Sequence, residues 1–172
     1  MLVISKKLVG LITLFCICSF AQAEIDAGDK QPMPELRWLD VAGEQHRLSE
    51  MTDKPKLLHF WAAWCIPCRK ELPEVAQWQK ENPQIDVLAL SLDQKIAQTK
   101  YFVKKYNIDM PALLLNEDDS DALGVPVVPY TIFVSKDNRF LGSLPGVAPW
   151  LEPAFTEEVH SLLLPLQADV SK

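Results

Sequence analysis

The sequence predicts an α/β domain with a mixed central sheet flanked by helices, and three observations support this. Apolar runs at 56–61, 85–91 and 124–134 have the length and composition of buried strands. Pro67 and good helix formers follow the first run, and residues at helical spacing follow the second, which is the alternation typical of an α/β sheet. A turn and a further strand come after the third run, so part of the sheet is expected to be antiparallel.

The first residues have the layout of a secretory signal peptide. Lys6 and Lys7 precede an apolar run at 8–20, and Ala21-Gln22-Ala23 has the small-residue pattern of a cleavage site. We expect cleavage after Ala23. The alternative is an uncleaved anchor, but a membrane-spanning helix needs roughly 20 apolar residues. Beyond the leader we expect a flexible N-terminus at 24–33, one domain at 34–165 and a tail at 166–172.

The cysteines indicate chemistry and not a stabilising framework. Of the four cysteines, Cys16 and Cys18 lie in the leader, which leaves Cys65 and Cys68 in the exported part. A disulfide between residues so close in the chain adds little chain-entropy stabilisation. The net charge of −6 argues against binding to nucleic acid or to anionic lipid through a basic patch.

The remaining elements can be assigned in chain order. Alternating residues at 34–51, with a turn at Gly43, predict a β-hairpin at the domain edge. After the strand at 56–61, Pro67 marks a helix start and Asn82-Pro83 its end. The further expected elements are an amphipathic helix at 94–107, a short strand at 112–115, a charged loop with a helix start at 116–120, a strand at 139–144 and a helix at 150–164 interrupted by Pro153.

This arrangement places Cys65 at a helix N-terminus. Unpaired backbone N–H groups and the helix dipole stabilise a negative sulfur there, and the thiolate is the reactive form in disulfide exchange. The spacing puts Cys68 within bonding reach of Cys65. The sequence therefore predicts a reversible Cys65–Cys68 disulfide.

The segment around these cysteines resembles thioredoxin. The resemblance rests on Trp64-Cys65-Ile66-Pro67-Cys68, on Phe60-Trp61 before it and on Pro73 after it, and Val128-Pro129 looks like the cis-proline of that fold. The leader, the N-terminal hairpin, residues 69–73 and a strand-helix insertion before the cis-proline resemble the exported TlpA/ResA/DsbE family. The resemblance covers residues 34–155. It implies a thioredoxin-like fold and a periplasmic thiol-disulfide oxidoreductase, which we expect to reduce disulfides in exported proteins.

The resemblance also implies roles for individual residues. Cys65 would attack a substrate disulfide and Cys68 would resolve the product. The backbone of Val128 and the ring of Pro129 would hold the substrate chain, with Trp64 at the rim of the site. The alternatives are a plain strand-entry role for Pro129 and a packing role for Trp64.

Two titratable residues near the cysteines are candidate modulators. Glu71 follows Cys68 by three residues and shares its helix face, where an acid tunes the thiols of ResA-like proteins. It could exchange protons with Cys68, or it could be an exposed helix carboxylate. His59 lies in the strand where thioredoxin has a buried acid. It could modulate the thiol pKa, or it could be a neutral, hydrogen-bonded residue without a catalytic part.

Other functions fit the sequence less well. A structural zinc site needs more ligands, and covalent haem attachment needs a histidine where Arg69 stands. A peroxiredoxin-type peroxidase does not account for the tight cysteine pair. We expect no cofactor and no metal. The expected partners are disulfide-containing exported proteins and a membrane electron donor of the DsbD or CcdA type, with cytochrome c maturation as one pathway. A disulfide oxidase or isomerase and a non-catalytic binding module stay open.

Overall fold

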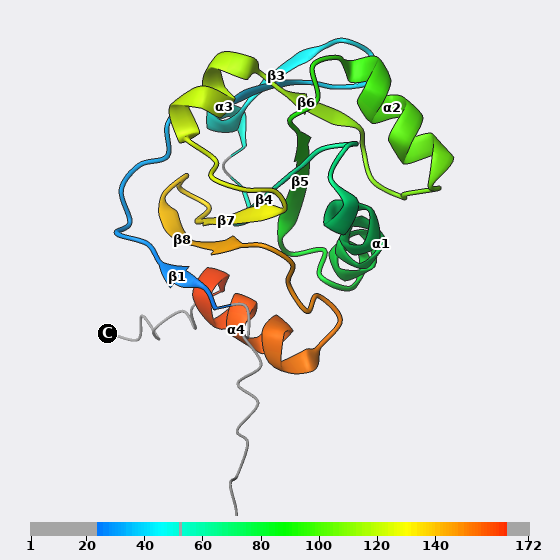
Figure 1. The fold of residues 1–172 in the computed structure, drawn as a ribbon. Helices are drawn as coiled ribbons and strands as arrows, with labels where there is room; N and C mark the ends of the chain where they lie inside the picture. The colour runs from blue at the N-terminus through cyan, green and yellow to red at the C-terminus, as the bar shows by residue number, and fades with distance from the viewer. Residues whose placement is uncertain (1–23, 52, 165–172) are drawn as a thin grey trace, which may run out of the picture.

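The computed structural model describes residues 24–51 and 53–164 (Figure 1). The signal peptide expected at 1–23 and the tail expected at 166–172 lie outside the described residues. Within the described ranges, no helix combines the length and the apolar character that a membrane span requires.

The described strands form one sheet of eight in the order β1-β8-β7-β4-β5-β6-β2-β3. Strands β4, β5 and β6 run parallel, and the other neighbouring pairs run antiparallel. This confirms the mixed α/β sheet. The strands are β1 (Asp26–Ala27), β2 (Arg37–Leu39), β3 (Gln45–Arg47), β4 (Lys56–Trp61), β5 (Asp86–Ser91), β6 (Leu113–Leu115), β7 (Tyr130–Val134) and β8 (Phe140–Pro145).

Four α-helices accompany the sheet in the described part of the chain: α1 (Ile66–Glu81), α2 (Ile96–Lys105), α3 (Glu117–Leu123) and α4 (Pro153–Leu163). A short 3-10 helix, Leu48–Glu50, follows the β2–β3 hairpin. Figure 1 shows α1 to one side of the central strands and α4 below them.

Strand β4 separates two layers of the core because its side chains alternate between the faces of the sheet. Leu57 packs in a cluster with Trp78 of α1 and Val159 of α4. Leu58 belongs to a second cluster, which includes Trp38 of the β2–β3 hairpin. His59 has the same parity as Leu57, so it faces the layer that contains α1 and α4.

Helix α1 begins directly at the cysteine pair. Cys65 is its N-cap residue, and Pro67 lies in the first turn, where a missing N–H leaves no hydrogen bond unmade. Pro73 lies within the helix but is exposed. The helix ends at Asn82, whose side-chain Nδ2 donates to the Trp78 carbonyl at 2.8 Å.

The N-terminal segment differs from the expectation of a flexible 24–33. Asp26–Ala27 forms strand β1 on the outer edge of β8, and Pro32 makes a bridge with Arg139. The Gly28 N–H donates to the Leu141 carbonyl at 2.8 Å. A polar sequence does not reveal this pairing because the backbone supplies its hydrogen bonds.

Three further boundaries differ from the sequence prediction. The charged segment at 116–120, where a loop with a helix start was expected, lies almost wholly in helix α3, which the Asn116 side chain caps. The strand expected at 124–134 begins only at Tyr130. Pro153 begins α4 and does not interrupt it, because proline is well tolerated at the first helical position.

Candidate active site

The cysteine pair forms a disulfide between the first turn of α1 and the residue that caps it. Cys65 and Cys68 are joined with their Cα atoms 5.3 Å apart. The backbone N–H of Cys68 points to the Cys65 sulfur at 3.2 Å, as expected for a sulfur at a helix N-terminus. Cys65 is 4% exposed and Cys68 is fully buried, so Cys65 is the more accessible of the two residues.

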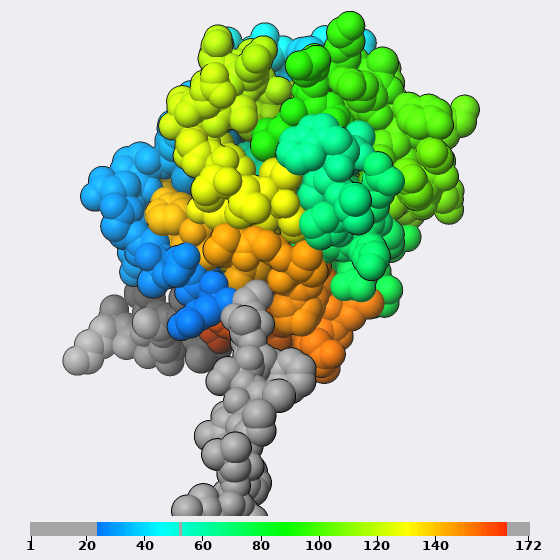
Figure 2. Space-filling view, in the orientation of Figure 1, coloured from blue at the N-terminus to red at the C-terminus, as the bar shows by residue number. Residues whose placement is uncertain are grey.

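The segment before β7 lies against this disulfide. The Val128–Pro129 peptide bond is cis, as the resemblance implied, and the Val128 carbonyl oxygen lies 3.6 Å from the Cys65 sulfur. Val128 is half-buried and Pro129 is buried. Figure 2 shows the beginning of α1 (teal), the segment before β7 (yellow) and the segment after β8 (orange) adjoining on one face of the molecule.

Exposed apolar side chains come from each of these three segments. Trp64 and Ile66 flank Cys65 and are 66% and 67% exposed. Val127 precedes Val128, and Val147 follows β8, and both are also exposed. Trp64 is thus a surface residue and does not pack in the core. An apolar rim of this kind can bind side chains on either side of a substrate disulfide.

A buried carboxylate holds the turn that carries the cysteines. Both Asp93 oxygens lie within hydrogen-bond distance of the Ala63 N–H, at 3.1 and 3.3 Å. The hydroxyl groups of Ser91 and Thr99 donate to the same carboxylate at 2.8 and 3.3 Å. Asp93 therefore connects the carboxyl end of β5 to the active-site turn.

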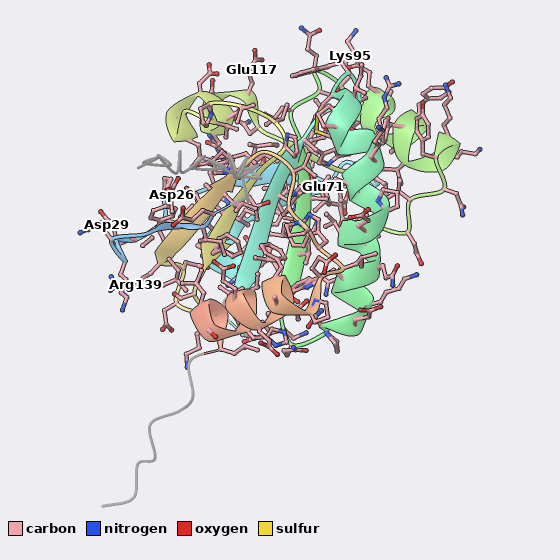
Figure 3. The ribbon with its side chains drawn as sticks, turned by 60° about the horizontal axis from the view of Figure 1, so that its bottom comes forward. Asp26, Asp29, Glu71, Lys95, Glu117 and Arg139 are labelled. Carbon is pink, nitrogen blue, oxygen red and sulfur yellow. A yellow bond between two sulfur atoms is a disulfide. The ribbon has the colours of Figure 1, made fainter. Side chains whose placement is uncertain are left out.

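Glu71 lies on the buried side of α1, and Figure 3 shows its label between this helix and the strands. It is only 2% exposed, so it is not an exposed helix carboxylate. Its Oε1 accepts from the Ala148 N–H at 2.9 Å and from Trp150 Nε1 at 2.6 Å. Burial raises the pKa of Glu71 to about 7, because the two hydrogen bonds only partly offset the loss of solvent.

His59 is fully buried beside Glu71. Its Nδ1 forms a hydrogen bond with Thr131 Oγ1 at 3.0 Å, and its Nε2 lies 3.9 Å from Glu71 Oε2. Its ring meets the Trp150 ring edge-on at 5.8 Å between centroids. Burial lowers the pKa of His59 to about 3, so the imidazole is neutral at ordinary pH.

The sequence analysis predicted a site made of the cysteine pair, Glu71 and the Val128-Pro129 segment. It did not identify the groups that position them. Ser91 and Asp93 could have been noticed as polar residues at the carboxyl end of a buried strand. Ala148 and Trp150 could not, because they contact Glu71 from 77 and 79 residues away in the chain.

The sequence profile of the AhpC/TSA family matches residues 28–139 of this chain. The chain belongs to the AhpC/TSA family. Its matched region begins just after β1 and includes the cysteine pair, Glu71 and the cis-proline segment.

Proteins with sequences similar to this chain are named as thiol-disulfide oxidoreductases and thioredoxin-like proteins. The thiol-disulfide oxidoreductase ResA of Geobacillus thermodenitrificans is 26% identical over 111 residues, which are 62% of this chain and 63% of ResA. The thioredoxin-like protein YneN of Bacillus subtilis is 30% identical over 100 residues, which are 56% of this chain and 59% of YneN. The matches thus span somewhat less than two thirds of these two relatives.

Solved structures confirm the thioredoxin-like fold. A thiol:disulfide interchange protein of the thioredoxin family from Chlorobium tepidum is 20% identical, with a TM-score of 0.65 over 78% of this chain and 97% of that protein. The exposed lipoprotein thioredoxin Etrx1 of Streptococcus pneumoniae is 25% identical, with a TM-score of 0.65 over 75% of this chain and 100% of Etrx1. The expected kinship with ResA-type proteins is confirmed.

Proposed function

We propose that this protein is a periplasmic thiol-disulfide oxidoreductase that reduces disulfides in exported proteins. The observation that carries the proposal is the Cys65–Cys68 disulfide at the N-terminus of α1, with Cys65 beside the Val128 carbonyl. The names of the relatives support the reaction type. The apolar rim supports a polypeptide substrate, because a bound chain can place side chains against it.

The first step uses the more accessible cysteine. In the reduced protein, the Cys65 thiolate attacks a substrate disulfide and forms a mixed disulfide, and the departing substrate sulfur takes a proton from water. The Cys68 N–H and the positive end of α1 stabilise the Cys65 thiolate. The substrate backbone lies along Val128, with Trp64 covering one side of it.

The second step regenerates the disulfide and releases the substrate. Cys68 gives its proton to the Glu71 carboxylate, and the new thiolate attacks the Cys65 sulfur. The bond from Cys65 to the substrate breaks, and the leaving substrate thiolate is protonated. Two electrons have then passed from the protein to the substrate. A carboxyl with a pKa of about 7 is suited to take up and release a proton near neutral pH.

The sequence supports the proposed cellular setting. A cleaved leader at 1–23 would direct the protein to the periplasm. A reductase there must itself be reduced again, and the family resemblance points to a membrane electron donor of the DsbD or CcdA type. Cytochrome c maturation is one pathway in which such a reductase acts.

The decisive experiment is the reduction potential of the Cys65–Cys68 couple. The purified protein is equilibrated with defined glutathione or dithiothreitol buffers, and its free thiols are trapped and counted. A potential near that of thioredoxin, roughly −270 mV, supports a reductase. A potential near that of DsbA, roughly −120 mV, contradicts this direction and supports an oxidase or isomerase.

Two cysteine variants distinguish catalysis from binding. Reduced Cys68→Ser should accumulate a mixed disulfide with a model disulfide substrate, because Cys65 attacks and nothing resolves the product. Cys65→Ser should form none. Substrate binding that survives in Cys65→Ser, together with no cycling in the unmodified protein, contradicts the enzyme and supports a binding module.

A further inference from the structure

Two buried polar atoms, one on the central strand and one on the active-site helix, face each other without another partner. They are Nε2 of His59, on β4, and Oε2 of Glu71, on α1, and they lie 3.9 Å apart. Within the described residues, neither atom has a hydrogen bond to any other group. Both side chains are shielded from solvent, where an unpaired polar atom costs about 1–3 kcal/mol.

The second polar atom of each side chain is already bonded, which restricts where a proton can be. Glu71 Oε1 accepts from two N–H donors, Ala148 N and Trp150 Nε1. A proton on the Glu71 carboxyl therefore belongs on Oε2, facing His59. His59 Nδ1 faces the hydroxyl of Thr131, which can either donate or accept a hydrogen bond.

Two arrangements satisfy every one of these atoms once a small side-chain movement brings Nε2 and Oε2 from 3.9 Å to a hydrogen-bond distance of about 2.7–3.2 Å. When Glu71 is neutral, its Oε2–H points to Nε2, and the ring carries its hydrogen on Nδ1 and donates to Thr131. When Glu71 is ionised, the ring carries its hydrogen on Nε2 and donates to Oε2, and the Thr131 hydroxyl donates to Nδ1. The imidazole is neutral in both arrangements, and Glu71 carries the proton by which they differ.

The surroundings favour titration of Glu71 over titration of His59. His59 faces Thr131 on β7, Ala89 on β5, the Trp150 ring after β8, and Glu71 on α1. Glu74, also on α1, raises the pKa of Glu71, and the main cause of that raised pKa is burial. Burial is the cause of the lowered pKa of His59.

We propose that His59 is a positioning residue that changes tautomer with the charge of Glu71, so that Oε2 keeps a hydrogen bond in both protonation states. This inference rests on the proposed function, in which Glu71 takes the proton of Cys68. The ring hydrogen moves from Nε2 to Nδ1 when the carboxyl gains a proton, and it returns when the proton leaves. Neither state then leaves an unpaired buried atom beside the disulfide.

The test is a titration of the imidazole nitrogens by NMR. The protein is labelled with ¹⁵N in its histidine rings and kept oxidised, so that no thiol titrates, from about pH 5 to about pH 9. His46→Gln and His160→Gln identify the signals of the other two histidines. We expect Nδ1 and Nε2 of His59 to exchange the ¹⁵N chemical shifts of a protonated and an unprotonated ring nitrogen, with a midpoint near pH 7. We expect Glu71→Gln to abolish this change. A single tautomer throughout, or an imidazolium, overturns the inference.

A pair of Thr131 variants tests the other end of the arrangement. Thr131→Val removes the hydroxyl but keeps the shape, and an unpaired Nδ1–H is then costly. The midpoint should move to lower pH, because the Nε2–H tautomer with ionised Glu71 is favoured. Thr131→Ser keeps the hydroxyl and should restore the original midpoint. Equal midpoints in the valine and serine variants contradict a part for Thr131 and overturn the inference.

Disulfide cycling in glutathione buffers, measured on the same samples, distinguishes the two proposals. If Cys65–Cys68 cycles while His59 keeps one tautomer, only the tautomer change is wrong. If the pair does not cycle, the proposed function fails whatever the NMR titration shows.

Discussion

Glu71 illustrates how burial alone can change the behaviour of a side chain. Its pKa in the folded protein is about 7, compared with an ordinary value of 4.5. The folded state therefore binds more protons than the unfolded state between these values, and this group makes the protein less stable as pH rises through them. A shift of this size corresponds to about 3 kcal/mol between the two limits.

We predict that Glu71→Gln makes stability less sensitive to pH. The difference in unfolding free energy, variant minus unmodified protein, should increase by about 2–3 kcal/mol from pH 5 to pH 8, because only the unmodified protein must bury a charge at pH 8. Urea denaturation of the oxidised proteins at both values measures it. His59 titrates in the same way in both proteins, so it cancels from the difference.

Glu81→Gln is the matched control, because Glu81 is an exposed carboxylate at the end of the same helix. Its difference from the unmodified protein should change little between the two pH values. If Glu71→Gln behaves like Glu81→Gln, Glu71 is ionised in the folded protein at pH 5, and the raised pKa is wrong.

At the scale of elements, the active-site turn depends on a strand that contributes no reactive group. Strand β5 ends at Ser91, and Asp93 just beyond it accepts the Ala63 N–H, two residues before Cys65. The hydroxyl groups of Ser91 and Thr99 complete the hydrogen bonds of this buried carboxylate. The network connects α2, β5 and the turn between β4 and α1.

We predict that Asp93→Asn lowers the unfolding free energy by about 1–3 kcal/mol. The amide keeps one acceptor oxygen, but its NH₂ group cannot accept from Ser91 or Thr99. Urea denaturation at neutral pH measures the loss. Asp109→Asn is the control, because Asp109 pairs with Lys80 at 2.7 Å on the surface, where solvent screens the pair and its loss should change the unfolding free energy little. Equal effects of the two substitutions contradict a structural role for Asp93.

The elements also show what the sequence could and could not predict. Strands β4 and β5 were predicted because their apolar runs are continuous, and helix α1 was predicted because Pro67 marks its start and Asn82-Pro83 its end. Strand β1 was missed because two exposed residues have no pattern, and only their backbone pairing with β8 defines them. In the site, the spacing within α1 joined Cys68 to Glu71. The orientation of Trp150 toward Glu71 depends on tertiary packing that no local pattern specifies.

For the molecule as a whole, the N-terminal segment covers one edge of the sheet. Strand β8 pairs with β7 on one side, and β1 covers its other side. The Phe140 N–H on that covered side donates to the Gln31 carbonyl at 2.9 Å. An uncovered strand edge is a template for pairing with other chains, so β1 is expected to keep the protein monodisperse as well as stable.

Two glycines, Gly28 and Gly142, make this close approach possible. A Cβ atom added at Gly28 would lie 2.5 Å from the Leu141 carbonyl carbon, which belongs to backbone and cannot move aside cheaply. We therefore predict that Gly28→Val detaches β1 from β8 and lowers the unfolding free energy by about 1–3 kcal/mol. Amide hydrogen exchange at Phe140 should become at least about tenfold faster, because its acceptor is lost.

The matched control is Ala27→Ser, an exposed position in β1 next to Gly28 that already carries a Cβ atom. It should keep the slow exchange of Phe140. Light scattering should show self-association in Gly28→Val and none in the control, because only the valine variant uncovers the edge of β8. Slow exchange at Phe140 in both proteins would mean that the backbone accommodates the valine and that Gly28 is not required for the closure of the sheet.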